Sequence, residues 1–114
     1  MCQPCRSELY TGQYPIRNGC AWNHSASRPG LSSMPQHLEP KGYRVGLAGK
    51  VHVRPAAVFP FKQVPGFAPN CVRNLSRLHA MAGIRPFMTG KKPVCLGVGW
   101  MDPHERRVMG YVAK

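Results

Sequence analysis

Two apolar runs of strand length stand out along the chain. One extends from Tyr43 to Ala48 and the other from Val94 to Trp100, and each is bounded by turn-forming or polar residues. A short, nearly continuous apolar run of this kind is typical of a buried strand. We therefore predict a buried strand over the first run and a second strand over the other.

Three further segments predict helices, the first from its flanking Pro and Gly and the other two because apolar residues fall on one face. They are residues 5–10, preceded by Pro4 and followed by Gly12; residues 33–41, with Ser33 as N-cap and Gly42 as C-cap; and residues 71–83, with Asn70 as N-cap and an apolar face of Val72, Leu75, Leu78 and Ala82. The stretches 13–30 and 54–70 predict loops, since Pro, Gly, Ser and Asn interrupt them.

The order helix, strand, helix, strand predicts an α/β fold with parallel strands and helical crossovers. With 114 residues, the chain predicts one small domain or part of a larger one. No apolar stretch approaches the roughly 18 residues of a membrane span. No signal peptide is expected either, because Cys2, Pro4 and Arg6 follow directly on Met1. The chain itself does not indicate its compartment.

Charge adds one constraint on ligands. Sixteen Lys and Arg residues face only four Asp and Glu residues, which gives a net charge of +12. Such a chain attracts polyanions, but its basic residues are scattered rather than gathered in a run. A Ca²⁺ site usually needs several carboxylate oxygens, so this chain alone is poorly equipped to build one.

Candidate chemistry begins at the N-terminus, where three interpretations of Cys2-Gln3-Pro4-Cys5-Arg6 compete. Cys2 and Cys5 could form a redox pair at a helix N-terminus. Cys2, Cys5, Cys20 and His24 could instead hold Zn²⁺ in a small basic module that contacts nucleic acid. In the third interpretation Cys2 acts alone and Arg6, one helical turn later, faces the same anion.

Polar residues also follow each predicted strand. Lys50 and His52 come after the first strand, and His104 comes after the second. Functional groups gather beyond the carboxyl ends of parallel strands, so these three are candidates. His24, His37 and His79 fit no such motif, and we expect surface or packing roles for them. Trp22 and Cys95 are expected in the core.

Three motifs in order resemble the sulfatases of the alkaline-phosphatase superfamily. The first is Cys-x-Pro-x-Arg followed by Leu-x-Thr-Gly within Cys2–Gly12, the second is Gly49-Lys50-Val51-His52, and the third is Asp102-Pro103-His104. Within that family, His52-Val53-Arg54-Pro55 and the following Phe59-Pro60-Phe61 most resemble the heparan N-sulfatase (sulfamidase) branch. The resemblance implies a partial alkaline-phosphatase-like sandwich over residues 1–114, with no complete second domain.

The resemblance also implies a mechanism, hydrolysis of a sulfate ester or N-sulfo group. A maturing enzyme would oxidise Cys2 to formylglycine, whose hydrate is the nucleophile and also a ligand of Ca²⁺. Arg6 would hold that hydrate, Lys50 would bind the sulfate oxygens, His52 would orient or deprotonate the hydrate, and His104 would bind sulfate or assist the leaving group. The implied partners are a sulfated carbohydrate or other sulfate ester and the maturing enzyme, with no nucleic acid. Family members act mostly in the periplasm, in lysosomes or outside the cell.

The sequence departs from the family pattern at several points. Cys5 replaces a Ser, Thr or Ala, and Arg54 stands where many relatives have Gly. The acidic pair that precedes the family's cysteine and the later Asp and Asn ligands have no counterpart in this chain. We therefore expect a truncated fragment of a sulfatase catalytic domain, with unpaired sheet edges and little or no activity of its own.

Overall fold

The centre of the fold is a three-stranded parallel sheet. In this computed structural model the structure describes residues 2–67 and 77–99. Strands β1 (Arg44–Gly49), β2 (Lys62–Gln63) and β3 (Val94–Gly99) lie in the order β2-β1-β3. β1 and β3 pair in parallel along their whole length, from Arg44 opposite Val94 to Gly49 opposite Gly99. The predicted α/β class and the parallel pair of strands are confirmed.

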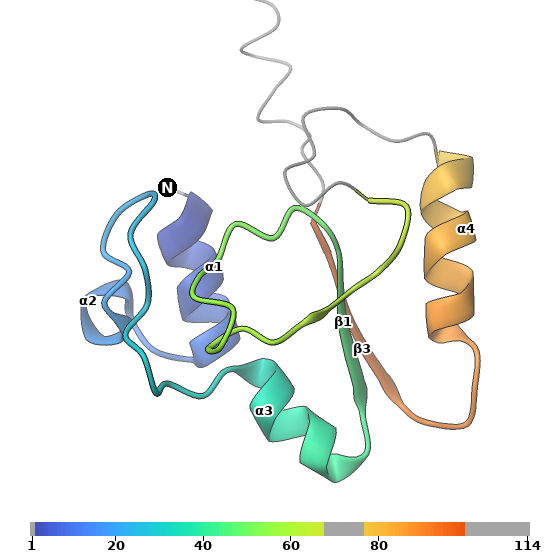
Figure 1. Cartoon of the computed structure of the whole chain (residues 1–114), viewed down its shortest axis with the longest axis horizontal. Coiled ribbons are helices and arrows are strands. Elements are labelled where there is room, and N and C mark those ends of the chain that lie inside the picture. The colour runs from blue at the N-terminus through green and yellow to red at the C-terminus, as the bar shows by residue number, and fades with distance from the viewer. Residues whose placement is uncertain (1, 68–76, 100–114) are drawn as a thin grey trace, which may run out of the picture.

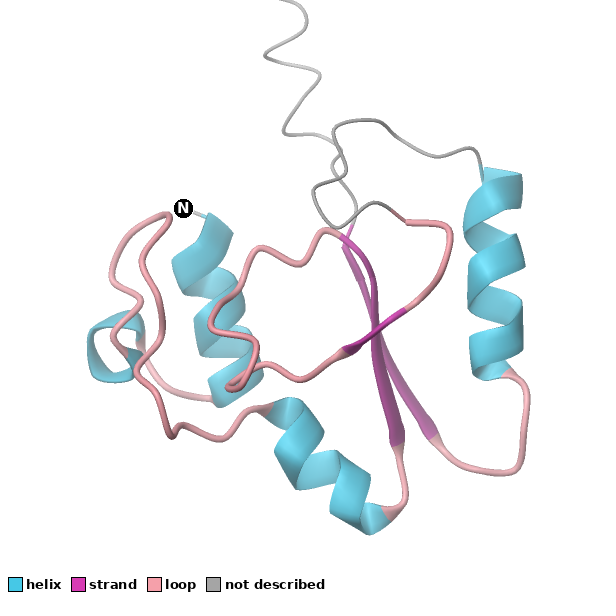
Figure 2. Cartoon of the chain, viewed as in Figure 1, coloured by secondary structure: helices cyan, strands magenta, loops and turns pink. Residues whose placement is uncertain are grey.

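Helices surround this sheet. They are α1 (Cys2–Thr11), α2 (Pro15–Asn18), α3 (Met34–Leu38) with the 3₁₀ turn η1 (Glu39–Lys41), and α4 (Arg77–Met88). Figure 1 shows α1 and α3 on one side of the strands and α4 on the other. Figure 2 shows two long loops, one between α2 and α3 and one between β1 and β2. The sheet is therefore the middle layer of three.

The α3–η1 segment follows the sequence signals closely. The Gln36 side chain accepts a hydrogen bond from the backbone N–H of Ser33 at 2.8 Å, which is one half of a capping box. Gly42 ends the segment in the left-handed conformation, with a φ of 86° and its N–H bonded to the carbonyl oxygen of Glu39. Both predicted caps are confirmed.

Three element boundaries differ from the sequence prediction. α1 begins at Cys2 rather than at residue 5, because Pro4 fits the first turn of a helix, where no N–H bond is needed. The predicted loop 13–30 contains α2, which Gly19 ends with a φ of 89°. The predicted connection 54–70 contains the short edge strand β2, whose partner is the middle of β1.

α4 also differs from its prediction. It continues past Gly83 and through Pro86 to Met88, and the first predicted residues, 71–76, lie outside the described part of the chain. Its contact face is different as well, because Ala82 is exposed. The Phe87 ring instead covers Gly46 of β1, where an added Cβ would come within 2.4 Å of it.

The core on the opposite face of the sheet joins α1 to β1. Tyr10 of α1 packs with Leu47, Val58 and Phe59 in one buried cluster. Leu47 and Gly46 are neighbours in a strand and so point to opposite faces, which is why one strand can bind α1 on one side and α4 on the other. The position of α1, and of the cysteine at its start, depends on this cluster.

Two of the minor core predictions are wrong. Trp22 is 67% exposed, because the loop that carries it lies outside the core cluster. Cys95 is only half-buried, and its Sγ lies 3.5 Å from the sulfur of Met34.

None of the helices within residues 2–67 and 77–99 has the length and apolar character that crossing a bilayer requires.

Replacing Leu47 by Ala should lower the free energy of unfolding by about 2–5 kcal/mol, because the substitution leaves a cavity between α1 and β1. Leu9→Ala is the matched control: Leu9 is 68% exposed, so its truncation should change stability by less than about 0.5 kcal/mol. Urea denaturation followed by circular dichroism measures both. Equal effects of the two substitutions would contradict the packing described.

Candidate active site

Arg6 connects the start of α1 to the end of β1. Its Nε donates a hydrogen bond to the Sγ of Cys2 at 3.2 Å, and its Nη1 donates one to the carbonyl oxygen of Lys50 at 2.8 Å. The first contact is possible because residues four apart lie on the same helix face. The second ties the thiol to the residue that follows the central strand.

Glycines at the strand ends leave room for this bridge. A Cβ at Gly99 would lie 2.8 Å from the carbonyl oxygen of Lys50 and 3.2 Å from Nη1 of Arg6. Gly49 has a φ of 84°, which favours glycine, and its missing side chain leaves space for the carbonyl oxygen of Gly99. Small residues at the ends of β1 and β3 therefore allow a guanidinium to reach the backbone.

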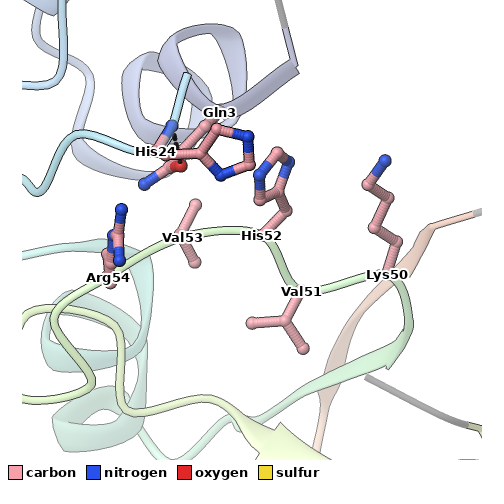
Figure 3. A pocket seen from close by; sticks show the side chains of 7 residues that line it. All are labelled: Gln3, His24, Lys50, Val51, His52, Val53 and Arg54. Atoms are coloured by element: carbon pink, nitrogen blue, oxygen red, sulfur yellow. Dashed lines mark hydrogen bonds between the residues drawn. The ribbon is translucent and has the colours of Figure 1, made fainter. Parts of the chain in front are cut away.

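Two adjoining cavities open at this end of the sheet. The thiol pocket, of about 930 Å³, has Cys2, Arg6 and Tyr10 in its lining. The histidine pocket, of about 590 Å³, is lined by Gln3, His24, Lys50, Val51, His52, Val53 and Arg54 (Figure 3). His24, Lys50 and His52 line both cavities, so the thiol and the imidazoles face one continuous space.

The buried side chain of Gln3 fixes the loop that carries His24. Its Oε1 accepts a hydrogen bond from the His24 N–H at 2.8 Å, and its Nε2 donates to the carbonyl oxygen of Ser25. The backbone N–H of Gln3 in turn donates to Oδ1 of Asn23 at 3.1 Å. Gln3 is 1% exposed, so these bonds are shielded from water. The loop 23–25 is thereby held against the first turn of α1, beside Cys2.

Both histidines adopt the left-handed backbone conformation. The φ angles are 68° for His24 and 44° for His52, and their rings face each other with centroids 5.4 Å apart. For a residue other than glycine this conformation costs about 1–2 kcal/mol. Such strain persists only where surrounding contacts impose it, and it is found most often at functional sites.

Positive charge dominates the histidine pocket. The pKa of His52 is lowered from its ordinary value of 6.5, first by burial and then by repulsion from Lys50, His24, Arg6 and Arg54. Its Nδ1 is buried and has no hydrogen-bond partner among the described residues. The imidazole is therefore held neutral at pH 7, as a general base must be.

Across the thiol pocket, the phenol of Tyr10 also remains neutral. Burial raises the pKa of Tyr10, although the nearby Arg6 guanidinium opposes the shift. The phenol therefore stays protonated at pH 7.

The described lining residues do not fit a Ca²⁺ ion. None of those lining the thiol or histidine pocket carries a carboxylate, and Ca²⁺ requires several oxygen ligands. Among residues 2–67 and 77–99, no three His, Cys, Asp or Glu side chains gather as metal ligands. A calcium ion bound by the intact family, with an incomplete site in this chain, stays a prediction.

The same observation does not favour the zinc alternative. Its four ligands, Cys2, Cys5, Cys20 and His24, all lie in the described part of the chain, yet they form no cluster. Cys20 is fully buried, with its Sγ 3.6 Å from the carbonyl oxygen of Ser25. This thiol belongs to the packing of the loop.

Four of the five candidate residues lie together. Cys2, Arg6, Lys50 and His52 all line the thiol pocket, and His104 lies outside the described residues. Sequence reasoning missed the contributions of Gln3 and His24. Gln3 occupies a variable position of the Cys-x-Pro-x-Arg motif, and its bonds join residues about twenty positions apart in the sequence, so no local pattern marks these contacts.

Known proteins with similar sequences are sulfatases. An "Ulvan-active sulfatase" of Formosa agariphila is 36% identical over 106 residues, which cover 91% of this chain and 21% of that protein. The human "N-sulphoglucosamine sulphohydrolase" is 32% identical over 114 residues, covering 90% of this chain and 22% of the enzyme. Human "Arylsulfatase H" is 35% identical over 65 residues, covering 46% of this chain and 12% of that protein.

The similarity thus extends over most of this chain but over a small share of each relative. The chain spans about a fifth of the length of the first two relatives. No protein-family model matches it.

Replacing Lys50 by Met should raise the pKa of His52 toward 6.5, because Lys50 is the largest charged contributor to its depression. Lys41→Met, in the η1 turn that precedes β1, should leave that pKa unchanged. NMR titration of the imidazole resonances measures both variants.

In the wild-type chain, the contribution of His52 to the free energy of unfolding should be complete above pH 6.5. It should be lost as the pH falls through the pKa of His52 in the folded state, because the unfolded chain binds the proton more tightly. A pKa of His52 above 6.5 would contradict this electrostatic account.

Proposed function

We propose, on the premise that the chain belongs to the sulfatase family, that it carries the nucleophile and sulfate-binding side of a sulfatase catalytic centre. The reaction is hydrolysis of a sulfate ester or an N-sulfo group, and Cys2 is the precursor of the nucleophile. The observation that supports this most directly is the bridge through Arg6. Its guanidinium contacts both the thiol of Cys2 and the carbonyl oxygen of Lys50, and so holds the motif cysteine beside the motif lysine.

Cys2 becomes the nucleophile when a maturing enzyme, using an oxidant that this enzyme binds, removes two electrons and two protons from the CH₂SH group. Oxygen replaces the sulfur, which leaves as hydrogen sulfide, and water then hydrates the resulting aldehyde. One hydroxyl oxygen of the hydrate attacks the sulfur atom of the substrate, and the bond from sulfur to the alcohol oxygen or amine nitrogen breaks. The leaving group takes a proton. The remaining hydroxyl then loses its proton, the carbonyl bond re-forms, and sulfate departs.

The neighbouring side chains suit the charges that develop in this reaction. Negative charge builds on the sulfate oxygens and on the leaving group, and fixed cations stabilise it. Lys50 binds the sulfate oxygens, and Arg6 holds the hydrate of the matured Cys2. His52, which burial and its cationic neighbours keep neutral, accepts the proton of the hydrate. His104 is proposed to bind sulfate or protonate the leaving group.

The substrate class follows from this chemistry and from the positive charge of the site. We propose a sulfated carbohydrate, with the enzyme that matures Cys2 as a protein partner. Calcium would need carboxylate ligands that the described pocket residues do not supply, so no step here depends on a metal. A zinc-dependent nucleic-acid function is not supported, since its ligand set is not assembled.

Co-expression of the chain with a formylglycine-generating enzyme should make Cys2 reactive toward an aldehyde-specific hydrazide probe. Cys2→Ser should abolish labelling, whereas Cys5→Ser should retain it, because the thiol of Cys5 is not the one that Arg6 contacts. Inorganic sulfate should slow the labelling by occupying the pocket beside the aldehyde. Mass spectrometry of the labelled peptide measures each result.

Lys50→Met should reduce this protection by sulfate about tenfold, since it removes a charged hydrogen-bond donor from the sulfate. Lys41→Met is the control and should preserve the protection. Absence of an aldehyde at Cys2, or protection by sulfate that is independent of Lys50, would overturn the proposal.

A further inference from the structure

We infer that Cys2 and Cys5 form a reversible disulfide, which withholds the Cys2 thiol from maturation under oxidising conditions. The inference rests on the proposed function for the role of Cys2. It goes beyond that function, because it makes formation of the nucleophile depend on the redox state of a second cysteine. Cys5 departs from the family pattern, so the pair belongs to this chain rather than to the family as a whole.

The first argument is the spacing of the two thiols. Cys2 and Cys5 lie three residues apart in the first turn of α1, and therefore on the same side of the helix. Helix geometry places Cα atoms at this spacing about 5 Å apart, within the span of about 4.4–6.8 Å that a disulfide bridges. Both residues line the thiol pocket. The two backbone positions are thus already at a bridging distance.

The second argument is the small adjustment that the bond requires. Cβ atoms at this spacing lie about 5–6 Å apart on a regular helix, whereas a disulfide needs about 3.5–4.5 Å. The first turn can tighten because its N–H groups have no partner within the helix, and Pro4, between the thiols, has no N–H. The strain that remains makes the bond easy to reduce, as is typical of regulatory disulfides.

The third argument is which thiols a soluble oxidant can reach. Cys5 is exposed and Cys2 is partly exposed, whereas Cys20 is buried. Cys95 lines the same pocket, but it belongs to β3, and its Sγ lies 3.5 Å from the sulfur of Met34. Among the described cysteines, the pair in the first turn of α1 therefore combines access with a bridging distance.

The oxidant is a small-molecule disulfide, and the bond forms in two exchange steps. The thiolate of Cys5, the more exposed residue, attacks that disulfide and displaces one of its thiols. The thiolate of Cys2, whose Sγ lies 3.2 Å from the Nε of Arg6, then attacks the sulfur of Cys5 and releases the second thiol. The two cysteines lose two electrons and two protons, which reduce the external disulfide to two thiols.

The bond controls maturation because it uses the sulfur that the maturing enzyme must remove. In the disulfide, Cys2 has no free thiol, and its sulfur is drawn toward Cys5. A cellular thiol reverses both exchange steps and restores the thiol beside Arg6. Conversion of Cys2 to the aldehyde therefore proceeds only while this pair is reduced.

The first test is a redox titration of the purified full chain in mixtures of oxidised and reduced glutathione. Trypsin releases both cysteines in one peptide, residues 1–6, because Arg6 is the first basic residue. Mass spectrometry should show that this peptide loses two hydrogen atoms as the share of glutathione disulfide rises, and regains them with dithiothreitol. Cys95→Ala removes another thiol of the same pocket and should leave the transition unchanged.

Three results of this titration would overturn the inference. They are a peptide that keeps both thiols, a peptide that carries glutathione without closing the internal bond, and a cross-link from Cys2 to Cys95.

The second test compares maturation in two hosts that co-express a formylglycine-generating enzyme. One host has a reducing cytoplasm, and the other lacks its thiol reductases and keeps an oxidising cytoplasm. The wild-type chain and Cys95→Ala should lose most of the aldehyde at Cys2 in the oxidising host. Cys5→Ser should form the same fraction of aldehyde in both hosts, because its Cys2 has no partner in the first turn.

An equal loss of aldehyde in Cys5→Ser and in the wild-type chain would overturn the control of maturation. Failure of the proposed function gives a different result. No aldehyde would then form in either host, while the glutathione titration, which needs no maturing enzyme, would still show whether the disulfide forms.

Discussion

The arrangement of this site depends on one side chain that joins two layers of the fold. Arg6 extends from the first helix to the end of the central strand, where it contacts the Cys2 thiol and the carbonyl oxygen of Lys50. The bridge needs a helix that starts at Cys2, a core that packs Tyr10 on Leu47, and a glycine at position 99. Helix, core and strand end therefore all contribute to the position of one thiol.

A second connection of the same kind holds the wall of the pocket that the loop 23–25 forms. Gln3, adjacent to the cysteine, binds the loop 23–25 through its side chain and its backbone. The first turn of α1 thus positions two groups at once, the thiol through Arg6 and the His24 loop through Gln3. Gln3 and Arg6 both belong to the first five residues of α1. A shift of that helix therefore moves the nucleophile and the pocket wall together.

Sequence reasoning predicted those parts of the molecule that local chemistry determines. Apolar runs identified β1 and β3, and Ser33 and Gly42 identified the ends of the α3–η1 segment. Parallel pairing then follows, and with it the placement of Lys50 and His52 at one edge. The extension of α4 through Pro86 was not predictable, because the packing of Phe87 on Gly46 compensates for a hydrogen bond that proline cannot make. Gln3 and His24 were missed for a similar reason, since their contacts join segments about twenty residues apart.

The central claim is that the Cys2 thiol lies at the carboxyl edge of the sheet, on the same side as His24 and His52. A nitroxide spin label on Cys2 tests it directly, in a chain whose other four cysteines are replaced by Ala. Paramagnetic broadening should be strong for the resonances of His24, Lys50 and His52. It should be weak for Lys92, which precedes β3 and so lies at the other end of a strand that is about 20 Å long. Strong broadening at Lys92, with sharp resonances from both histidines, would contradict the account.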